Sequence, residues 1–146
     1  MELNNIIRGI DLFEGLTSTE LDEIAAICQP RRFKKDDLLA VQGEIGEEIF
    51  FIMEGVVEVL INTEQETPKV VVNLGTGQII GEMSLVDRGP RSATVRAIHD
   101  PTIVQSILHQ DFHDLCKRKT RIGYVVMHNI AADLSFKLRH QHLSEG

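Results

Sequence analysis

Cysteine is scarce in this sequence: only Cys28 and Cys116 occur among its 146 residues. They lie far apart, in segments that we expect to be helical, so we interpret them as reduced core residues and not as a disulfide framework. A chain of this length buries roughly two-thirds of its unfolded surface when it folds. We therefore expect a stable fold that needs neither a disulfide nor a metal.

Long apolar runs are also missing. A membrane-spanning helix needs about 18 apolar residues in succession, and no segment approaches that length. The N-terminus lacks the basic and apolar regions of a signal peptide. Hydrophobic residues make up 42% of the chain and charged residues 25%, which is typical of globular proteins. We expect a cytoplasmic protein with no membrane partner.

Excess positive charge is the third absence. The net charge is −7, whereas non-specific binding to nucleic acid requires basic residues that neutralise phosphates. Basic residues do cluster at 31–35 and 117–121. We interpret both clusters as solvated faces, with a partner surface as the alternative. No direct contact with nucleic acid is expected.

The spacing of apolar residues divides one predicted domain, 1–146, into three parts. Residues 1–29 are expected to be helical, because Thr17 and Glu20 have the spacing of a capping box and the helix after them should end near Cys28. Residues 30–108 change to a strand-like pattern, and residues 109–146 return to a helical one.

Short apolar segments separated by Gly, Asp, Asn and Pro predict about eight strands in the middle part. Their expected bounds are 31–34, 38–41, 48–54, 56–62, 69–74, 78–80, 93–98 and 102–108. Many short strands at this spacing predict a mainly β fold with flanking helices, either a jelly roll or a sandwich.

Two helices are predicted after the last strand, at 110–117 and from 122 to about 138. The second carries an apolar stripe at a spacing of three to four residues, formed by Val126, Met127, Ile130, Ala131, Leu134 and Leu138. The stripe is wide for a helix at the end of a barrel. Two interpretations stay open: burial on its own domain, or partial contact with a second subunit.

Residues 81–95 combine a glycine turn, a short helical segment and an arginine inside a run that should be buried. Gly81 allows a positive φ or a close approach to a ligand, because it has no Cβ. Residues 83–86 can form one helical turn whose first N–H groups have no partner within it. Such a turn favours a phosphate at its start.

Arg91 and Glu82 define the ligand further. The guanidinium of Arg91 matches two phosphate oxygens at once. The carboxylate of Glu82 repels a phosphate, so it fits the site only if it accepts a hydrogen bond from a hydroxyl on the same ligand. One phosphate and one hydroxyl indicate a nucleotide, whereas a simple surface Glu–Arg ion pair is the alternative.

The motif Gly81-Glu82-x-x-Leu85, followed by Pro90-Arg91-Ser92-Ala93-Thr94-Val95-x-Ala97, resembles the phosphate-binding cassette of cyclic nucleotide-binding domains. This family includes the catabolite activator protein, protein kinase A regulatory subunits and cyclic-nucleotide-gated channels. Upstream, Gly43-x-x-Gly46 and Phe51-Ile52-x-x-Gly55-x-Val57-x-Val59 are similar to the glycines and strands that precede the cassette. The resemblance covers most of the chain and favours the jelly roll, interrupted by the cassette's short helix.

The resemblance also implies roles for individual residues. Glu82 would bind the ribose 2′-hydroxyl and Arg91 the cyclic phosphate, helped by backbone N–H groups near Ser84 and Ser92. A purine would lie between Val71 and the helix around residues 137–140. The expected ligand-binding residues are thus Gly81, Glu82, Met83, Ser84, Arg91, Ser92 and Val71.

The function expected from this resemblance is a non-catalytic regulatory sensor, in which cyclic AMP or cyclic GMP closes the C-terminal helix over the base. Members that prefer cyclic GMP often have Thr after the arginine, so Ser92 favours cyclic AMP. A scaffold or homodimer formed through the C-terminal helix is one alternative, and a regulatory fragment of a larger transcription factor or channel is another. The effector protein is unknown. Direct DNA binding is not expected, because only about eight residues follow Leu138.

Catalysis and metal binding are not expected. The spacing of His109 and His113 suits a helix, but five of the six histidines lie beyond the last predicted strand and cannot converge inside the barrel. Neither Ser84 nor Ser92 has a histidine placed to act as a base.

Overall fold

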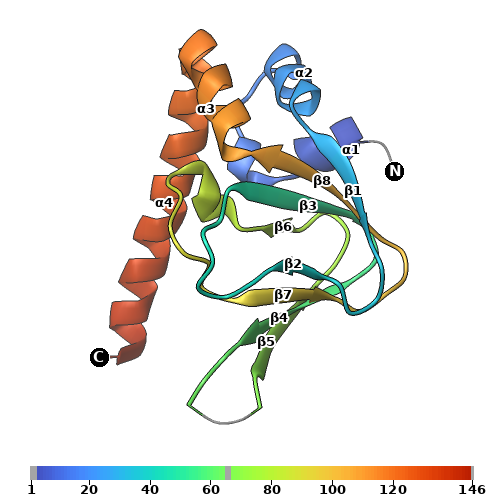
Figure 1. The fold of residues 1–146 in the computed structure, drawn as a ribbon. Helices are drawn as coiled ribbons and strands as arrows, with labels where there is room; N and C mark the ends of the chain where they lie inside the picture. The colour runs from blue at the N-terminus through green and yellow to red at the C-terminus, as the bar shows by residue number, and fades with distance from the viewer. Residues whose placement is uncertain (1–2, 65–66, 146) are drawn as a thin grey trace.

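Two antiparallel sheets form the body of the protein in the computed structural model, which describes residues 3–64 and 67–145 (for 142–145 the backbone only). The strands are β1 (Gln29–Phe33), β2 (Leu38–Ala40), β3 (Glu48–Glu54), β4 (Val57–Ile61), β5 (Lys69–Leu74), β6 (Ile79–Ile80), β7 (Thr94–Ala97) and β8 (Thr102–Leu108). One sheet has the order β1-β8-β3-β6 and the other β2-β7-β4-β5 (Figure 1).

This architecture confirms the mainly β jelly roll with flanking helices. Each predicted strand occurs, and no end lies more than two residues from its predicted position. The sequence succeeds here because turn residues separate the short apolar segments clearly. The predicted domain limits, residues 1 and 146, lie outside the described residues.

Strand β3 connects the two parts of the hydrophobic core. Its four central residues, Ile49 to Ile52, are fully buried. Because side chains alternate along a strand, Ile49 and Phe51 pack with the helices, while Phe50 and Ile52 pack between the two sheets. This two-sided burial explains why β3 is continuously apolar and does not alternate with polar residues.

Helices lie at both ends of the chain. They are α1 (Leu3–Arg8), η1 (Asp11–Phe13), α2 (Ser18–Ala26), α3 (His109–Arg118) and α4 (Thr120–Glu145), with the short η2 (Glu82–Leu85) between strands. The predicted capping box is present: the Glu20 backbone N–H donates to the Thr17 hydroxyl at 3.2 Å, and the Thr17 N–H donates to the Glu20 carboxylate at 2.9 Å. Helix α2 ends at Ala26, two residues before the predicted end.

Helix α4 runs along one side of the molecule, past η2 (Figure 1). The apolar stripe predicted for it divides into two halves, here called the near half (residues up to Ile130) and the far half (the residues after it, toward the C-terminus). Val126 and Ile130 in the near half are buried against the domain, at 0% and 4% exposure. Leu134 and Leu138 in the far half are 40% and 57% exposed. Burial on its own domain therefore accounts for the near half alone.

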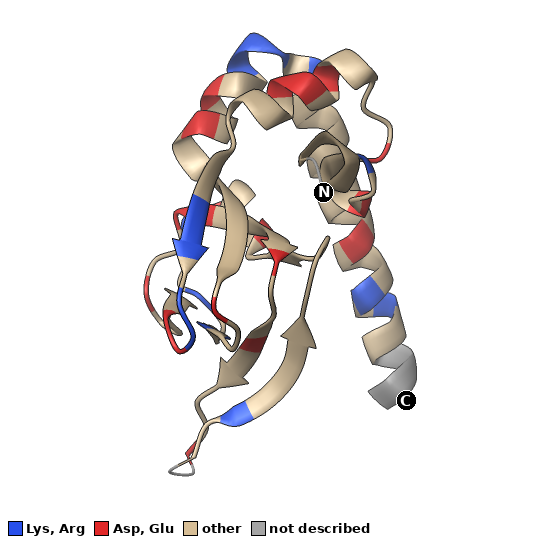
Figure 2. Cartoon of the chain, turned by 90° about the vertical axis from the view of Figure 1, so that its right-hand side faces the viewer, with Lys and Arg blue, Asp and Glu red and all other residues tan. Residues whose placement is uncertain are grey.

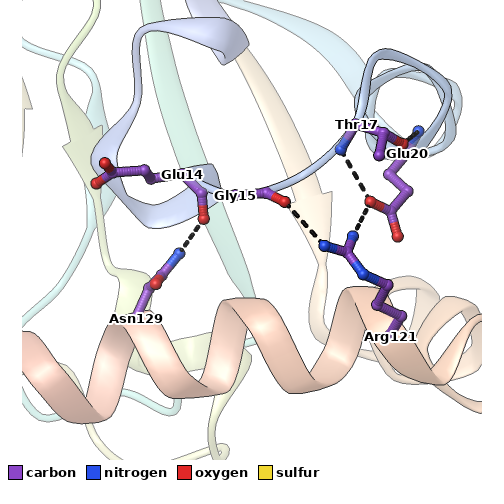
Figure 3. Close-up of polar contacts among 6 residues, drawn as sticks. All are labelled: Glu14, Gly15, Thr17, Glu20, Arg121 and Asn129. Atoms are coloured by element: carbon purple, nitrogen blue, oxygen red, sulfur yellow. Dashed lines mark hydrogen bonds and ion pairs between the residues drawn. The ribbon is translucent and has the colours of Figure 1, made fainter.

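Two side chains of α4 attach the near half to the N-terminal segment (Figure 3). Asn129 donates two hydrogen bonds of 2.9 Å from Nδ2, to the carbonyls of Leu12 and Glu14. Arg121 donates to the Gly15 carbonyl at 3.2 Å and forms an ion pair with Glu20. The hydrogen bond from the Thr17 backbone, helped by Arg121, lowers the pKa of the Glu20 carboxyl. The capping box of α2 is thus connected to α4.

Both cysteines are free thiols, as predicted. Burial raises the pKa of Cys28 to about 12 and that of Cys116 to about 11. Since the thiolate is the reactive form, both side chains act as small apolar residues. No helix in the described part of the chain is long and apolar enough to cross a membrane.

The substitution Asn129→Ala should reduce the free energy of unfolding by about 1–2 kcal/mol, because two backbone carbonyls lose their donor. Chemical denaturation would measure the change. His128→Ala, at an exposed position one residue earlier on α4, is the matched control and should stay within about 0.5 kcal/mol. Equal losses in the two variants would show that the Asn129 contacts contribute nothing.

Candidate functional site

Two segments far apart in sequence meet at the candidate site. The Arg91 backbone N–H donates to the Glu44 carbonyl at 2.7 Å, and the Gly43 N–H donates to the Arg91 carbonyl at 2.9 Å. The next residue pair along the two segments, Ile45 and Pro90, forms a β-bridge. The glycine-containing turn after β2 therefore holds the backbone of Arg91 in position.

The Arg91 guanidinium is held in place by the protein. One terminal nitrogen donates to the Ser84 hydroxyl at 3.1 Å, and the other donates to the Glu48 backbone carbonyl at 2.7 Å. The Phe50 ring lies 5.9 Å from the guanidinium carbon. A guanidinium carries five N–H donors, so these contacts orient the group without using all of its donors.

Burial lowers the pKa of Arg91, and the nearby Glu48 acts in the opposite direction. The ordinary pKa of arginine lies so high that the group stays positively charged at neutral pH. A half-buried cation held in this way attracts an anion more strongly than a solvated one, because the surrounding dielectric constant is lower.

Two glycines make room for the guanidinium. Gly81 has a φ of 77°, and a Cβ on it would lie 2.2 Å from a terminal nitrogen of Arg91. A Cβ on Gly46 would lie 2.7 Å from both Arg91 Nε and the Ser84 hydroxyl. Any side chain at either position would force a shift, which gives a physical reason for glycine at both.

Two cavities meet at Arg91. The first, here called the cassette cavity, has a volume of about 280 Å³ and is lined by residues of the 81–92 segment. The second, the barrel cavity, has about 210 Å³ and extends between the sheets to Val59 and Val95. Gly81, Glu82, Arg91 and Ser92 line both cavities. A single ligand can therefore place an anionic group and an apolar group on the two sides of these residues.

A third cavity, here called the helix cavity, has about 350 Å³ and lies between η2, the N-terminal segment and α4. Glu82 and Met83 line it together with Asn129, Ile130 and Asp133 of α4. Glu82 thus lies where all three cavities meet, on the side of the site that faces α4.

The structure brings six of the seven predicted ligand-binding residues together. These are Gly81, Glu82, Met83, Ser84, Arg91 and Ser92, which all line the cassette cavity. Val71 lies apart from them on β5, 51% exposed, where the pairing of β4 and β5 has a register irregularity. The predicted helical turn is present as η2, a 3₁₀ helix that begins at Glu82, one residue earlier than expected.

Sequence patterns did not indicate three contacts of the site. The acceptor at Glu48 is a backbone carbonyl, which no residue type reveals. Gly46 was noted for its spacing and not for its contact with Arg91. His109 Nδ1 lies 2.6 Å from the Ser84 carbonyl and so links α3 to η2. The sequence indicated His109 only by its position after the last strand and its helical spacing to His113, and neither points to Ser84.

The described residues contain no group of three or more His, Cys, Asp or Glu side chains placed to hold a metal ion. The His109 and His113 rings, which share a helix face, stack with their centres 6.1 Å apart. The charged residues that line the cassette cavity are Glu82, Asp87 and Arg91, so Arg91 is the one cation among its lining residues.

Comparison with known proteins agrees with this geometry. A family model described as the cyclic nucleotide-binding domain matches residues 30–119, which includes both sheets and α3. The chain belongs to the cyclic nucleotide-binding domain family. This confirms the resemblance stated from the cassette motif.

Relatives of this cyclic nucleotide-binding domain include regulators and channels. The cyclic AMP receptor protein of Thermus thermophilus is 30% identical over 133 residues, which are 91% of this chain and 59% of that protein. A cyclic nucleotide-gated potassium channel of Rhizobium etli is 34% identical over 121 residues, or 83% of this chain and 32% of the channel. The chain therefore spans less than two-thirds of these relatives.

Solved structures show the same fold. The crystal structure of the Thermus thermophilus catabolite activator protein superposes with a TM-score of 0.79 at 30% identity, covering 92% of this chain and 61% of that one.

The substitution Gly81→Ala should displace the Arg91 guanidinium, because the new Cβ would overlap a terminal nitrogen of the arginine. Gly77→Ala is the matched control, since Gly77 has a similar φ of 86° and no heavy atom within 4 Å of a new Cβ. Both variants should lose about 1–2 kcal/mol of stability from the left-handed backbone. Only Gly81→Ala should shift the NMR signal of Arg91 Nε–H, and an unchanged signal would contradict the close approach.

Proposed function

We propose that this chain is a cyclic nucleotide sensor domain that prefers cyclic AMP and transmits binding through α4. The observation that supports this most directly is the Arg91 guanidinium, held by Ser84 and the Glu48 carbonyl beside the cassette cavity. A cation already oriented by the protein loses little freedom when a phosphate binds, so more of the interaction energy appears as affinity.

Arg91 is assigned to the cyclic phosphate and Glu82 to the ribose. The two side chains line the same cavity but carry opposite charges, so one ligand must present an anion to one and a donor to the other. A cyclic nucleotide satisfies both, since its phosphate is anionic and its 2′-hydroxyl is a donor. The adjacent barrel cavity then receives apolar edges of the ligand.

The purine is assigned to the space between Val71 and the far half of α4. Val71, Leu138 and Phe136 are each more than half exposed, so a base between β5 and the helix would bury apolar surface on both sides. Ser92 follows Arg91 and supplies a hydroxyl without the methyl group of threonine, which favours cyclic AMP over cyclic GMP. Closure of α4 over the base is the proposed response.

The sensor is proposed to act without catalysis, in the cytoplasm, on an effector protein that is still unknown.

A homodimer through α4 is a second candidate, supported by the exposed apolar residues Leu134, Phe136 and Leu138 in the far half of the helix. The relatives extend well beyond the matched region, so a regulatory part of a larger protein fits the same site.

Calorimetric titration with cyclic AMP and cyclic GMP tests the function, and binding of neither would contradict it. Arg91→Ala should lower the affinity about 10–1,000-fold, because lost hydrogen bonds to a charged group cost about 1.5–3 kcal/mol each. Arg88→Ala removes an exposed arginine, which contacts Gln110, and should leave the affinity unchanged. If the affinity of Arg91→Ala for the cyclic nucleotide stayed within threefold of the parent's, Arg91 would not be the residue that binds the phosphate.

Closure of α4 should appear in amide hydrogen exchange. Saturating cyclic AMP should slow exchange across residues 128–142 more than in α2, because the ligand would order the exposed far half of α4. Leu138→Asp should weaken binding although it lies outside the cassette. If exchange across 128–142 were the same with and without ligand, α4 would not be the responding element.

A further inference from the structure

Hydrogen bonds join His109, Ser84 and Arg91 to the start of β3 in a closed ring. The His109 backbone N–H donates to the Glu47 carbonyl at 2.7 Å, and its ring Nδ1 lies 2.6 Å from the Ser84 carbonyl. Arg91 makes the corresponding contacts from the other side, since it donates to the Glu48 carbonyl at 2.7 Å and to the Ser84 hydroxyl at 3.1 Å. His109 and Arg91 thus hold the same two segments, the start of β3 and η2.

Ser84 is held at its backbone and at its side chain. Its backbone N–H donates to the Gly81 carbonyl at 2.9 Å, and its hydroxyl accepts from Arg91. The residue is buried. The carbonyls in the last turn of a helix have no donor within that helix. The His109 ring, which comes from the first residue of α3, supplies a donor to the Ser84 carbonyl.

This contact assigns the proton on the imidazole of His109. A carbonyl oxygen can only accept a hydrogen bond, so Nδ1 has to carry a proton. In the neutral ring Nε2 is then the nitrogen without one. His109 therefore donates twice, from its backbone to Glu47 and from its ring to Ser84, and so connects two segments that are far apart in the sequence.

We propose that His109 is a positioning residue for the cyclic phosphate. Its ring N–H holds the Ser84 backbone, the Ser84 hydroxyl orients the Arg91 guanidinium, and Arg91 meets the phosphate in the cassette cavity. His109 lines none of the three cavities, so it acts through Ser84 and not on the ligand itself. The inference rests on the proposed function and adds a residue of α3 to that site.

The overall charge of the protein makes the placement of Arg91 important. The net charge is −7, and Figure 2 shows Asp and Glu residues on the helices and among the strands. The general field of the protein therefore repels an anion. Arg91 is the one cation among the residues that line the cassette cavity. Because hydrogen bonds weaken steeply when they are misaligned, a displaced guanidinium would bind the phosphate less tightly.

Two variants of similar shape test the proposal through their affinities for cyclic AMP. His109→Asn places an amide N–H close to the position of Nδ1, whereas His109→Leu has no donor there. His109→Leu should weaken binding about 2–12-fold, the range expected for one hydrogen bond, and His109→Asn should recover most of that loss. His113→Leu removes an exposed imidazole one turn later and should leave the affinity unchanged. If His109→Asn bound no better than His109→Leu, the proposal would be overturned.

The Ser84 hydroxyl separates positioning of Arg91 from a general effect on stability. Ser84→Ala keeps the carbonyl that His109 contacts but removes the hydroxyl that Arg91 contacts. If His109 acts through this hydroxyl, His109→Leu should weaken binding less in the Ser84→Ala background than in the parent. Equal losses in the two backgrounds would overturn the proposal, because His109 would then act by another route.

NMR without ligand keeps this inference distinct from the proposed function. Nitrogen NMR of the imidazole should show a proton on Nδ1 of His109 at about pH 8, where an ordinary imidazole is neutral. The Arg91 Nε–H signal should shift in His109→Leu and stay at the parent position in His113→Leu. An Nδ1 without a proton, or an Arg91 signal unaffected by His109→Leu, would overturn the proposal. Failure of the parent to bind any cyclic nucleotide would contradict the proposed function and leave this result standing.

Discussion

The half-buried guanidinium of Arg91 is the group around which the site is built. Its orientation depends on a backbone carbonyl at Glu48 and on the Ser84 hydroxyl, and its space depends on glycines at positions 46 and 81. A buried cation without such partners is costly, so the surrounding segments have to meet for this residue to be tolerated. The same requirement makes a cavity beside it attractive to an anion.

The arrangement of β3 shows how the fold supplies those partners. Its residues alternate between the core under the helices and the core between the sheets, so the strand is buried on both faces. A strand fixed in this way presents the Glu48 carbonyl at a constant position, just where the strand begins. The rigidity of the core therefore determines the geometry of a polar contact at its edge.

The sequence predicted the fold and the proximity of the cassette residues, for physical reasons that can be named. Turn residues separate the strands, the Thr17–Glu20 capping box is a local pattern, and the cassette residues lie within twelve positions of one another, from 81 to 92. Contacts between distant residues were not predicted. Arg91 and Glu48 are 43 residues apart, and Asn129 and Leu12 are 117 residues apart. Every residue has a backbone carbonyl, so the residue type does not indicate which carbonyl accepts a hydrogen bond. Only the structure reveals such contacts.

The division of α4 into a tied and an exposed half has a geometric consequence. Asn129 fixes the helix near its middle, and the described side chains continue to Gln141. At 1.5 Å per residue, the part of the helix from Asn129 to Gln141 is about 18 Å long. A rotation of about 15° at its base, comparable with known subunit rotations, would move the tip by about 5 Å. A displacement of this size is similar to the diameter of a side chain. A movement of α4 in response to ligand would thus be enlarged along the helix into a displacement the size of a side chain.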